Sequence, residues 1–145
     1  MFEGNHFKDG LQTIQENLTP ETIGVGVDIE NISRFENSNI VKNTSFLERV
    51  FTQKELDYCY SNQFPAQHLA ARFAGKEAII KAASGMKKEI FSYHDIQIIN
   101  NKSGAPSATI QKECFNDIAI NISLSHARDL AIAFVIITQP VRKEV

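Results

Sequence analysis

The stretch Ala71-Arg72-Phe73-Ala74-Gly75-Lys76-Glu77-Ala78-Ile79-Ile80-Lys81-Ala82 places one acid among three bases in a segment that is otherwise apolar or small. Leu69, Phe73 and Ile80 recur at spacings of four and seven, so at about 100° per residue they share one helix face. Glu77 borders that face. A carboxylate at the edge of an apolar stripe is partly desolvated, which is costly unless a cation pairs with it. The segment therefore predicts a buried helix that holds a charge.

Two partners are open to the Glu77 carboxylate. Lys81 lies one helical turn later, in the acid-before-base order that favours an ion pair, and a metal ion is the alternative. Arg72 and Lys76 project from a neighbouring side of the helix, where a solvated basic flank would also explain them. Taken alone, the segment favours the ion pair over the metal.

Composition sets the class of protein. The 145 residues are 43% hydrophobic and 22% charged, which suits one compact domain with a real core. A net charge of −2 gives no overall attraction to nucleic acid or to an anionic membrane. No apolar run approaches the about 20 residues that span a bilayer, and the first residues lack a signal-peptide pattern. Cys59 and Cys114 are far apart and are expected to be small core residues. We therefore predict a cytoplasmic protein without nucleic-acid or membrane partners.

Before the helix, residues 23 to 30 (Ile-Gly-Val-Gly-Val-Asp-Ile-Glu) alternate strictly and predict a strand. Its odd positions are apolar and β-branched and are expected to pack, whereas its even face carries two glycines and then Asp28 and Glu30. Glycines inside a strand usually mark the close approach of another segment or a ligand. A half-exposed strand with solvated acids explains the pattern equally well.

Residues 33 to 63 are predicted to form interrupted helices. Ser45 with Glu48, and Thr52 with Glu55, each fit the reciprocal capping pattern at a helix start. The long helix is then predicted over residues 66 to 84, after Pro65 and with Gly85 at its C-terminal cap.

Residues 1 to 22 look like an N-terminal extension, which leaves residues 23 to 145 as the main domain. Residues 7 to 18 fit an amphipathic helix that docks on the core, or a disordered leader that orders against a partner. The apolar residues at helical spacing are Phe7, Leu11, Ile14 and Leu18.

The rest of the chain is predicted to be mostly strand. Residues 95 to 100 and 107 to 111 flank a polar turn, and residues 118 to 126 alternate in polarity. Residues 130 to 137 are continuously apolar, as expected for a central strand that is covered on both faces and forms a hairpin with the preceding one. A strand, then helices, then several strands predict an α+β domain.

Three polar residues fall near element ends or on the long helix: Asp28, Glu77 and His126. Two carboxylates from separate elements are the minimum that magnesium takes from a protein when substrate phosphates and water supply its other ligands. Sequence spacing alone leaves open whether the two acids meet.

Four blocks of sequence, in order, resemble holo-acyl-carrier-protein synthase, the small 4'-phosphopantetheinyl transferases. The match runs from about residue 23 to residue 137 and includes the Gly104-Ala105-Pro106 turn. Four blocks together are far more specific than one, so they favour the metal site over the simple ion pair. The blocks are residues 24–30, Phe51-Thr52 with Glu55, residues 72–78 with Lys81-Ala82, and residues 123–126.

The resemblance implies magnesium-dependent transfer of 4'-phosphopantetheine from coenzyme A to a serine of an apo acyl carrier protein, with release of adenosine 3',5'-bisphosphate. It implies an antiparallel sheet packed with a long central helix and shorter helices, a homotrimer with sites between subunits, and a cytoplasmic role in fatty acid biosynthesis and lipid metabolism. By the same resemblance, Asp28 and Glu77 would bind the metal and Lys81 the pyrophosphate. Contacts to other coenzyme A phosphates would come from Arg72, Lys76 and His126.

The predicted catalytic residues are Glu77, Lys81 and His126. Attack by a serine needs its proton removed and the charge that grows on the phosphate oxygens neutralised. Lys81 and magnesium meet the second need, while Glu77, a metal-bound water and His126 remain open as the base, with His126 expected chiefly to orient coenzyme A. The alternative functions are a magnesium-dependent phosphoesterase and a non-catalytic coenzyme A-binding domain of the same fold.

Overall fold

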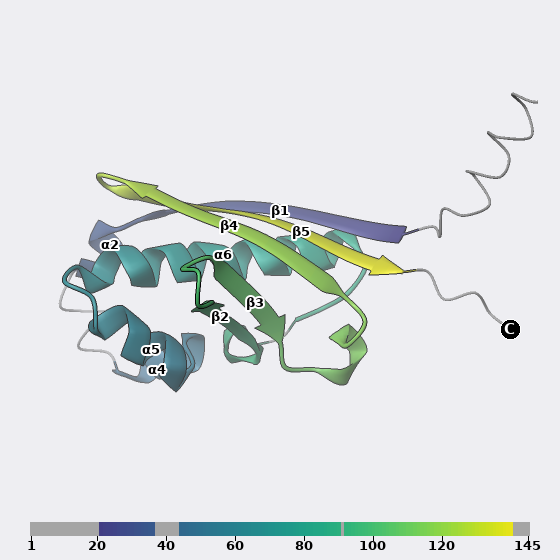
Figure 1. The fold of residues 1–145 in the computed structure, drawn as a ribbon, viewed down its shortest axis with the longest axis horizontal. Helices are drawn as coiled ribbons and strands as arrows, with labels where there is room; N and C mark the ends of the chain where they lie inside the picture. Colours follow the sequence, from purple (N-terminus) through teal and green to yellow (C-terminus); the bar gives the residue numbers. More distant parts are fainter. Residues whose placement is uncertain (1–20, 37–43, 91, 141–145) are drawn as a thin grey trace, which may run out of the picture.

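The chain forms three layers, with the long helix α6 between a three-stranded sheet and a layer of short helices and a hairpin (Figure 1). The computed structural model describes residues 21–36, 44–90 and 92–140. In chain order the elements are β1 (Glu21–Asn31), α2 (Ser33–Glu36), α4 (Thr44–Val50), α5 (Gln53–Tyr60), α6 (Pro65–Gly85), η1 (Tyr93–Asp95), β2 (Ile96–Asn100), β3 (Pro106–Ile110), η2 (Glu113–Phe115), β4 (Ala119–Ala127) and β5 (Leu130–Pro140).

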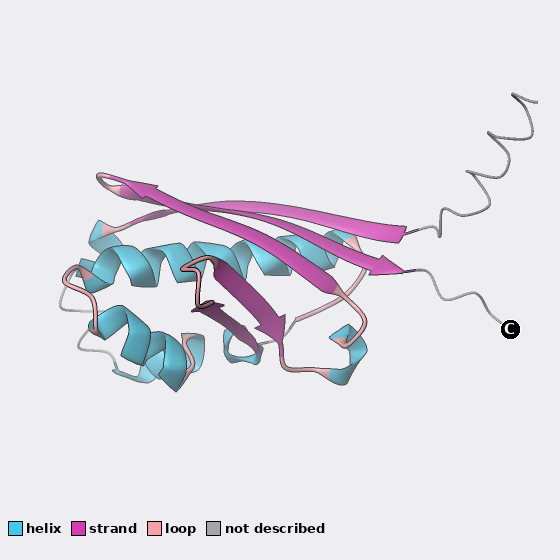
Figure 2. Ribbon diagram, viewed as in Figure 1, coloured by secondary structure: helices cyan, strands magenta, loops and turns pink. Residues whose placement is uncertain are grey.

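The large sheet is antiparallel, with strand order β1-β5-β4 (Figure 2). Asp28 of β1 lies opposite Ala133 of β5, and His126 of β4 lies opposite Ala131. Arg128, with φ of 51°, lies in the tight turn between β4 and β5. The predicted hairpin and the central place of the apolar strand are confirmed.

The strands β2 and β3 make a second, separate antiparallel sheet. Their turn contains Gly104, whose φ of 86° favours glycine because it has no Cβ. The Asn101 side-chain oxygen accepts from the backbone N–H groups of Ser103 and Ala105, both at 3.0 Å, which closes the turn. This hairpin was predicted, but its separation from the large sheet was not.

Helix α6 is covered on both flanks, by the large sheet on one side and by the small sheet and short helices on the other (Figure 1). Its bounds agree with the predicted ones to within a residue. All side chains from Leu69 to Lys76 are buried. The predicted single apolar stripe therefore understates its burial, because two layers pack against it.

Gly24 and Gly26 let the backbone of α6 lie directly against β1. A Cβ at Gly24 would collide with the carbonyl of Ala82, and one at Gly26 with the carbonyl of Ala78. The predicted close approach is confirmed, and the approaching segment is the helix. The crossing sets the next part of β1, and with it Asp28, against the middle of α6.

The opposite face of the large sheet is apolar and exposed in the single chain. The predictions that the odd positions of β1 pack and that β5 is covered on both faces are wrong here, because α6 covers only the glycine side. Exposed fractions are 51–57% for Ile23, Val25, Val27 and Ile29, and 41–45% for Leu130, Ile132 and Phe134.

The two predicted capping motifs have different outcomes. At the start of α5, the Thr52 hydroxyl accepts from the backbone N–H of Glu55, and the Glu55 carboxylate accepts from the backbone N–H of Thr52 at 2.7 Å. This capping box is confirmed. Ser45 is already inside α4, which begins at Thr44, so its predicted place before the helix is wrong.

The remaining predictions concern the cysteines, the membrane and the N-terminal segment. Cys59 lies in the core as expected, whereas Cys114 is exposed on η2, so its predicted burial is wrong. In the part of the chain that the structure describes, no helix is both long and apolar enough to cross a membrane. The predicted helix over residues 7 to 18 lies outside the described residues.

Candidate active site

The centre of the site is a contact between β1 and α6. The Lys81 ammonium donates to Asp28 Oδ1 at 2.7 Å and to the carbonyl of Val27 at 3.0 Å. Asp28 is largely buried, with 14% of its side chain exposed, and Lys81 is half-exposed. The hydrogen bond from Lys81 to Asp28 raises the pKa of Lys81, which keeps the ammonium charged at neutral pH. Lys81 thus pairs with the strand acid, and not with Glu77 of its own helix as the simple reading of the sequence favoured.

The second oxygen of Asp28 has an unsatisfied lone pair. Oδ2 is buried and has no hydrogen-bond partner among the described residues. Leaving a buried acceptor unsatisfied costs on the order of 1–3 kcal/mol, and more for a charged group, so such an oxygen favours a ligand that supplies positive charge. No group of three His, Cys, Asp or Glu side chains within the described residues is arranged to hold a metal. An ion at Asp28 would therefore take most of its ligands from substrate and water.

Glu77 is held by a residue that the sequence analysis did not select. Its Oε1 accepts a hydrogen bond from the hydroxyl of Tyr93, the first residue of η1. Burial, and then the hydrogen bond and charge of Glu77, raise the pKa of Tyr93 to about 12, so the phenol is a protonated donor at neutral pH. Sequence spacing gave no signal for this contact, because it depends on how the loop after α6 returns.

A third acid, Glu30, lies near the other two. Its carboxylate accepts from Arg34 Nη1 at 3.1 Å, and 15% of its side chain is exposed. Burial raises the pKa of Glu30, Arg34 opposes this, and the charges of Asp28 and Glu77 raise it further. The three acids are therefore near enough for their charges to interact, and Arg34 and Lys81 pair with two of them, Glu30 and Asp28.

Lys76 lies in the interior. Its ammonium donates to Glu55 Oε2 at 2.8 Å and to three carbonyls, those of Val50 and Ile96 at 2.6 Å and that of Tyr93 at 3.0 Å. Neither side chain of the Lys76 and Glu55 pair is exposed. Three N–H groups already share four acceptors, so this geometry does not fit the predicted phosphate contact of Lys76, and we correct it to a structural role.

Arg72 is also buried, with 2% of the residue exposed. Its Nε donates to the carbonyl of Ile98 at 3.1 Å, and its Nη2 donates to Asn100 Oδ1 at 2.8 Å. The guanidinium lies 4.1 Å from the centre of the Tyr58 ring. The alternative prediction that Arg72 and Lys76 form a solvated basic flank is therefore wrong, because both side chains are buried. Arg72 thus links α6 to β2, and two of its three guanidinium nitrogens already have partners, so few N–H groups remain to bind a coenzyme A phosphate.

His126 is exposed near the end of β4. It lies in the same cross-strand row as Glu30 of β1, with Ala131 of β5 between them. Its ring centre is 6.4 Å from that of His68, which is 5.6 Å from that of Tyr58. Burial, then Arg72 and then His126, lower the pKa of His68. His68 precedes Glu77 by nine residues on α6, about 14 Å along the helix axis. The fold thus brings Lys81 and Asp28 into contact, with Glu77 one helical turn before Lys81, and it places His126 two strands from Glu30, on the other side of β5.

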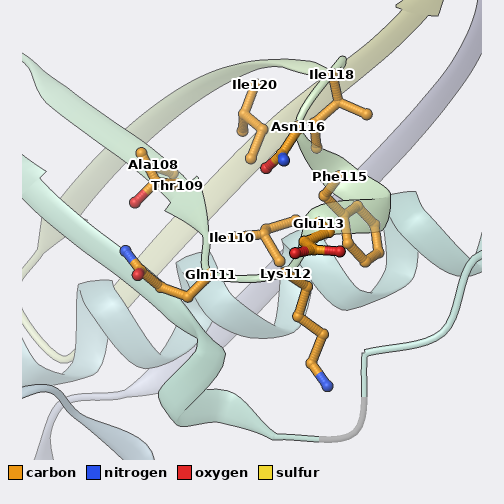
Figure 3. Close-up of a pocket in the computed structure, with 10 residues that line it drawn as sticks. All are labelled: Ala108, Thr109, Ile110, Gln111, Lys112, Glu113, Phe115, Asn116, Ile118 and Ile120. Carbon is orange, nitrogen blue, oxygen red and sulfur yellow. The ribbon is translucent and has the colours of Figure 1, made fainter.

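A cavity of about 520 Å³ lies away from this site, between β3, η2 and β4, and none of the predicted site residues lines it (Figure 3). Figure 3 shows that the Lys112 side chain points away from the other lining residues. We place the site at Asp28 and α6, because the charged and unsatisfied groups gather there.

Comparison with known proteins identifies the family. The model of the 4'-phosphopantetheinyl transferase superfamily matches residues 24–135, which include Asp28, Glu77, Lys81 and His126. The chain belongs to this superfamily. The resemblance inferred from the four sequence blocks is thereby confirmed, as is the α+β fold.

Three relatives illustrate the likeness of this transferase-family chain. It is 40% identical over 122 residues to the holo-[acyl-carrier-protein] synthase of Clostridium tetani, a match that covers 79% of this chain and 94% of that one. The structure titled Chronobacterium ammoniagenes ACPS-CoA complex superposes with a TM-score of 0.70 at 25% identity, covering 83% of this chain and 99% of that one. The Helicobacter pylori synthase in complex with coenzyme A gives 0.65 at 30% identity, with coverage of 78% and 98%.

Proposed function

We propose that this protein is a holo-[acyl-carrier-protein] synthase. It transfers 4'-phosphopantetheine from coenzyme A to a serine hydroxyl of an apo acyl carrier protein, breaking the pyrophosphate bond and releasing adenosine 3',5'-bisphosphate. Relatives with this name match the chain over nearly their whole length, and two of the similar structures are described as coenzyme A complexes. The observation that carries the proposal at the level of residues is the contact between Lys81 of α6 and Asp28 of β1, with Glu77 one helical turn before Lys81.

We further propose that the site takes a magnesium ion. The available oxygens fit a hard cation, because the buried Oδ2 of Asp28 has no hydrogen-bond partner among the described residues. A second carboxylate is near, since the charge of Glu77 raises the pKa of both Lys81 and Glu30. Asp28 and Glu77 would hold the ion. Bound there, it would neutralise charge that develops on the pyrophosphate oxygens of coenzyme A.

We assign phosphate binding, proton removal and the second coenzyme A contact to three side chains of this protein. Lys81 is half-exposed and charged, so it can reach a phosphate while Asp28 holds its position. The Glu77 oxygen that is not bonded to Tyr93 would accept the proton of the attacking serine. His126 would bind another part of coenzyme A than the reacting phosphate, because it lies on β4, two strands away from β1.

The transferase activity can be tested by mass spectrometry of the carrier. Apo carrier protein incubated with this protein, coenzyme A and magnesium is expected to gain the mass of one phosphopantetheine group. Carriers of fatty acid, polyketide and peptide synthesis should be compared, and the carrier that gains the mass fastest identifies the partner.

Two controls make that test specific. A carrier whose acceptor serine is replaced by alanine should gain no mass, and coenzyme A with magnesium but without carrier should remain intact. Breakdown of coenzyme A in the absence of carrier would point to a phosphoesterase instead. No mass gain on any carrier, with the protein folded, would contradict the transferase.

We also propose that the protein acts as a homotrimer. The outer face of β1 and β5 is the main support, because a monomer rarely leaves a contiguous apolar sheet face in water. As the family resemblance implies, the active sites would lie between subunits, so that His126 of one subunit approaches the Asp28 region of the next. Three copies would bury this face around a common axis.

Replacing Phe134 with glutamate tests the trimer. Phe134 is central to the outer face, and an unpaired buried charge costs about 3–5 kcal/mol, so association should weaken more than 100-fold. Sedimentation equilibrium should show monomers, and transferase activity should fall with the loss of trimer. Thr109→Glu, on the exposed side of β3, is the control and should leave both unchanged. A wild-type protein that is monomeric and fully active would refute the shared site.

A further inference from the structure

We propose that Tyr93 is a positioning residue for Glu77. Its hydroxyl holds one carboxylate oxygen of Glu77, so that the other oxygen faces the divalent cation and the attacking serine. This inference rests on the proposed metal-binding role of Glu77. It adds to the reaction a residue outside the four sequence blocks that carried the resemblance.

Both the ring and the backbone of Tyr93 are held in place by α6. Its ring packs on Phe73 with a centroid distance of 5.5 Å and an interplanar angle of 33°. Its backbone carbonyl accepts from the buried ammonium of Lys76 at 3.0 Å. Phe73, Lys76 and Glu77 are on neighbouring turns of α6, so the helix that carries the carboxylate also anchors its hydrogen-bond donor.

The loop that carries Tyr93 is itself closed by local hydrogen bonds. The Ser92 hydroxyl accepts from the backbone N–H of His94 at 3.3 Å, and the Ser92 carbonyl accepts from the N–H of Asp95 at 3.2 Å. The strand β2 follows at once, and Glu55 accepts from the N–H of Ile98 at 2.8 Å. The Tyr93 hydroxyl is therefore presented by a segment tied to the core.

Fixing Glu77 has a chemical consequence. A glutamate side chain has three rotatable bonds, and an unheld carboxylate at the edge of a helix would lose that freedom each time a metal bound. A hydrogen bond to a charged acceptor is also stronger than a neutral one. Groups that orient a metal-binding side chain typically change metal affinity or activity by about 10 to 100-fold when they are removed.

Tyr93→Phe removes the hydroxyl and keeps the ring on Phe73 and the backbone carbonyl for Lys76. Mn²⁺ is a suitable probe, because free Mn²⁺ is measured directly by electron paramagnetic resonance without coenzyme A or carrier. We expect Mn²⁺ affinity to fall about tenfold. In turnover assays the magnesium concentration for half-maximal rate should rise by the same factor, while the KM for coenzyme A stays within about twofold.

Tyr60→Phe is the matched control, since it removes a hydroxyl from a ring that is 47% exposed on α5. It should leave Mn²⁺ affinity, the magnesium requirement and the melting temperature unchanged. The Tyr93→Phe melting temperature, measured by circular dichroism, should stay within a few degrees of wild type, because the apolar contacts of the ring remain.

The variant Glu77→Gln distinguishes a failure of the Tyr93 role from a failure of the proposed metal role of Glu77. If Glu77→Gln loses Mn²⁺ binding and Tyr93→Phe binds like wild type, Tyr93 does not position Glu77, and the metal role of Glu77 stands. If Glu77→Gln itself binds Mn²⁺ like wild type, the metal assignment fails and the role of Tyr93 fails with it. Tighter Mn²⁺ binding by Tyr93→Phe would mean that the hydroxyl competes with the metal, which also overturns the inference.

Discussion

Asp28→Asn is expected to lower the rate of carrier modification about 1000-fold, because metal-assisted charge stabilisation is worth several kcal/mol and each 1.4 kcal/mol is a factor of ten. Asparagine has the shape of aspartate but lacks the charge that pairs with Lys81 and the second anionic oxygen, which is buried and unsatisfied. The substitution therefore removes the metal ligand and the anchor of Lys81 in one step.

The rate should be measured by carrier mass at saturating coenzyme A and across a range of magnesium concentrations. Asp57→Asn is the control, since that carboxylate is exposed on α5 and accepts a hydrogen bond from Gln53. It should react like wild type. An Asp28→Asn variant with wild-type turnover and an unchanged magnesium requirement would show that Asp28 does not hold the metal.

Lys76→Met is expected to lower the free energy of unfolding by about 3–5 kcal/mol, the cost of removing one partner of a buried ion pair. Methionine fills a similar volume but leaves the Glu55 carboxylate charged and unpaired in the core. It also leaves the carbonyls of Val50, Tyr93 and Ile96 without the donor that they share. The loss should therefore exceed that of an ordinary surface substitution several-fold.

Urea unfolding at fixed protein concentration measures this loss, since association would otherwise change the apparent stability. The double variant Glu55→Gln, Lys76→Met should recover part of it, because the uncompensated charge is removed. Lys112→Met breaks a partly exposed ion pair with Asp95 and should cost less than about 1 kcal/mol. If Lys76→Met kept full stability but raised the KM for coenzyme A, a phosphate contact would be the better explanation of Lys76.

Much of the fold could be predicted because local rules decided it. The capping box of Thr52 and Glu55 starts α5, and the Gly104 turn joins β2 to β3. The alternation of glycines on β1 predicted a close neighbour, which proved to be the α6 backbone. Each of these depends on residues near one another in the chain, so spacing is a sufficient guide.

The errors came from burial, which no local pattern determines. Lys76 and Arg72 were expected outside the core, yet carbonyls and Glu55 from other elements satisfy them inside it. Val27 was expected to pack, yet its face of the sheet is exposed in the single chain. A charged residue is buried only when distant groups can pair with it, and those groups are brought together by the tertiary fold.

The sequence by itself determined the family and the long helix, and it selected Asp28 and Glu77 as candidates, because these follow from ordered motifs and from periodicity along one segment. Only the tertiary structure decided the partners of those acids: Lys81 for Asp28, and Tyr93 for Glu77. The reason is physical. A hydrogen bond acts over about 3 Å, and which groups reach that distance is settled by the crossing of β1 and α6 and by the return of the loop after α6.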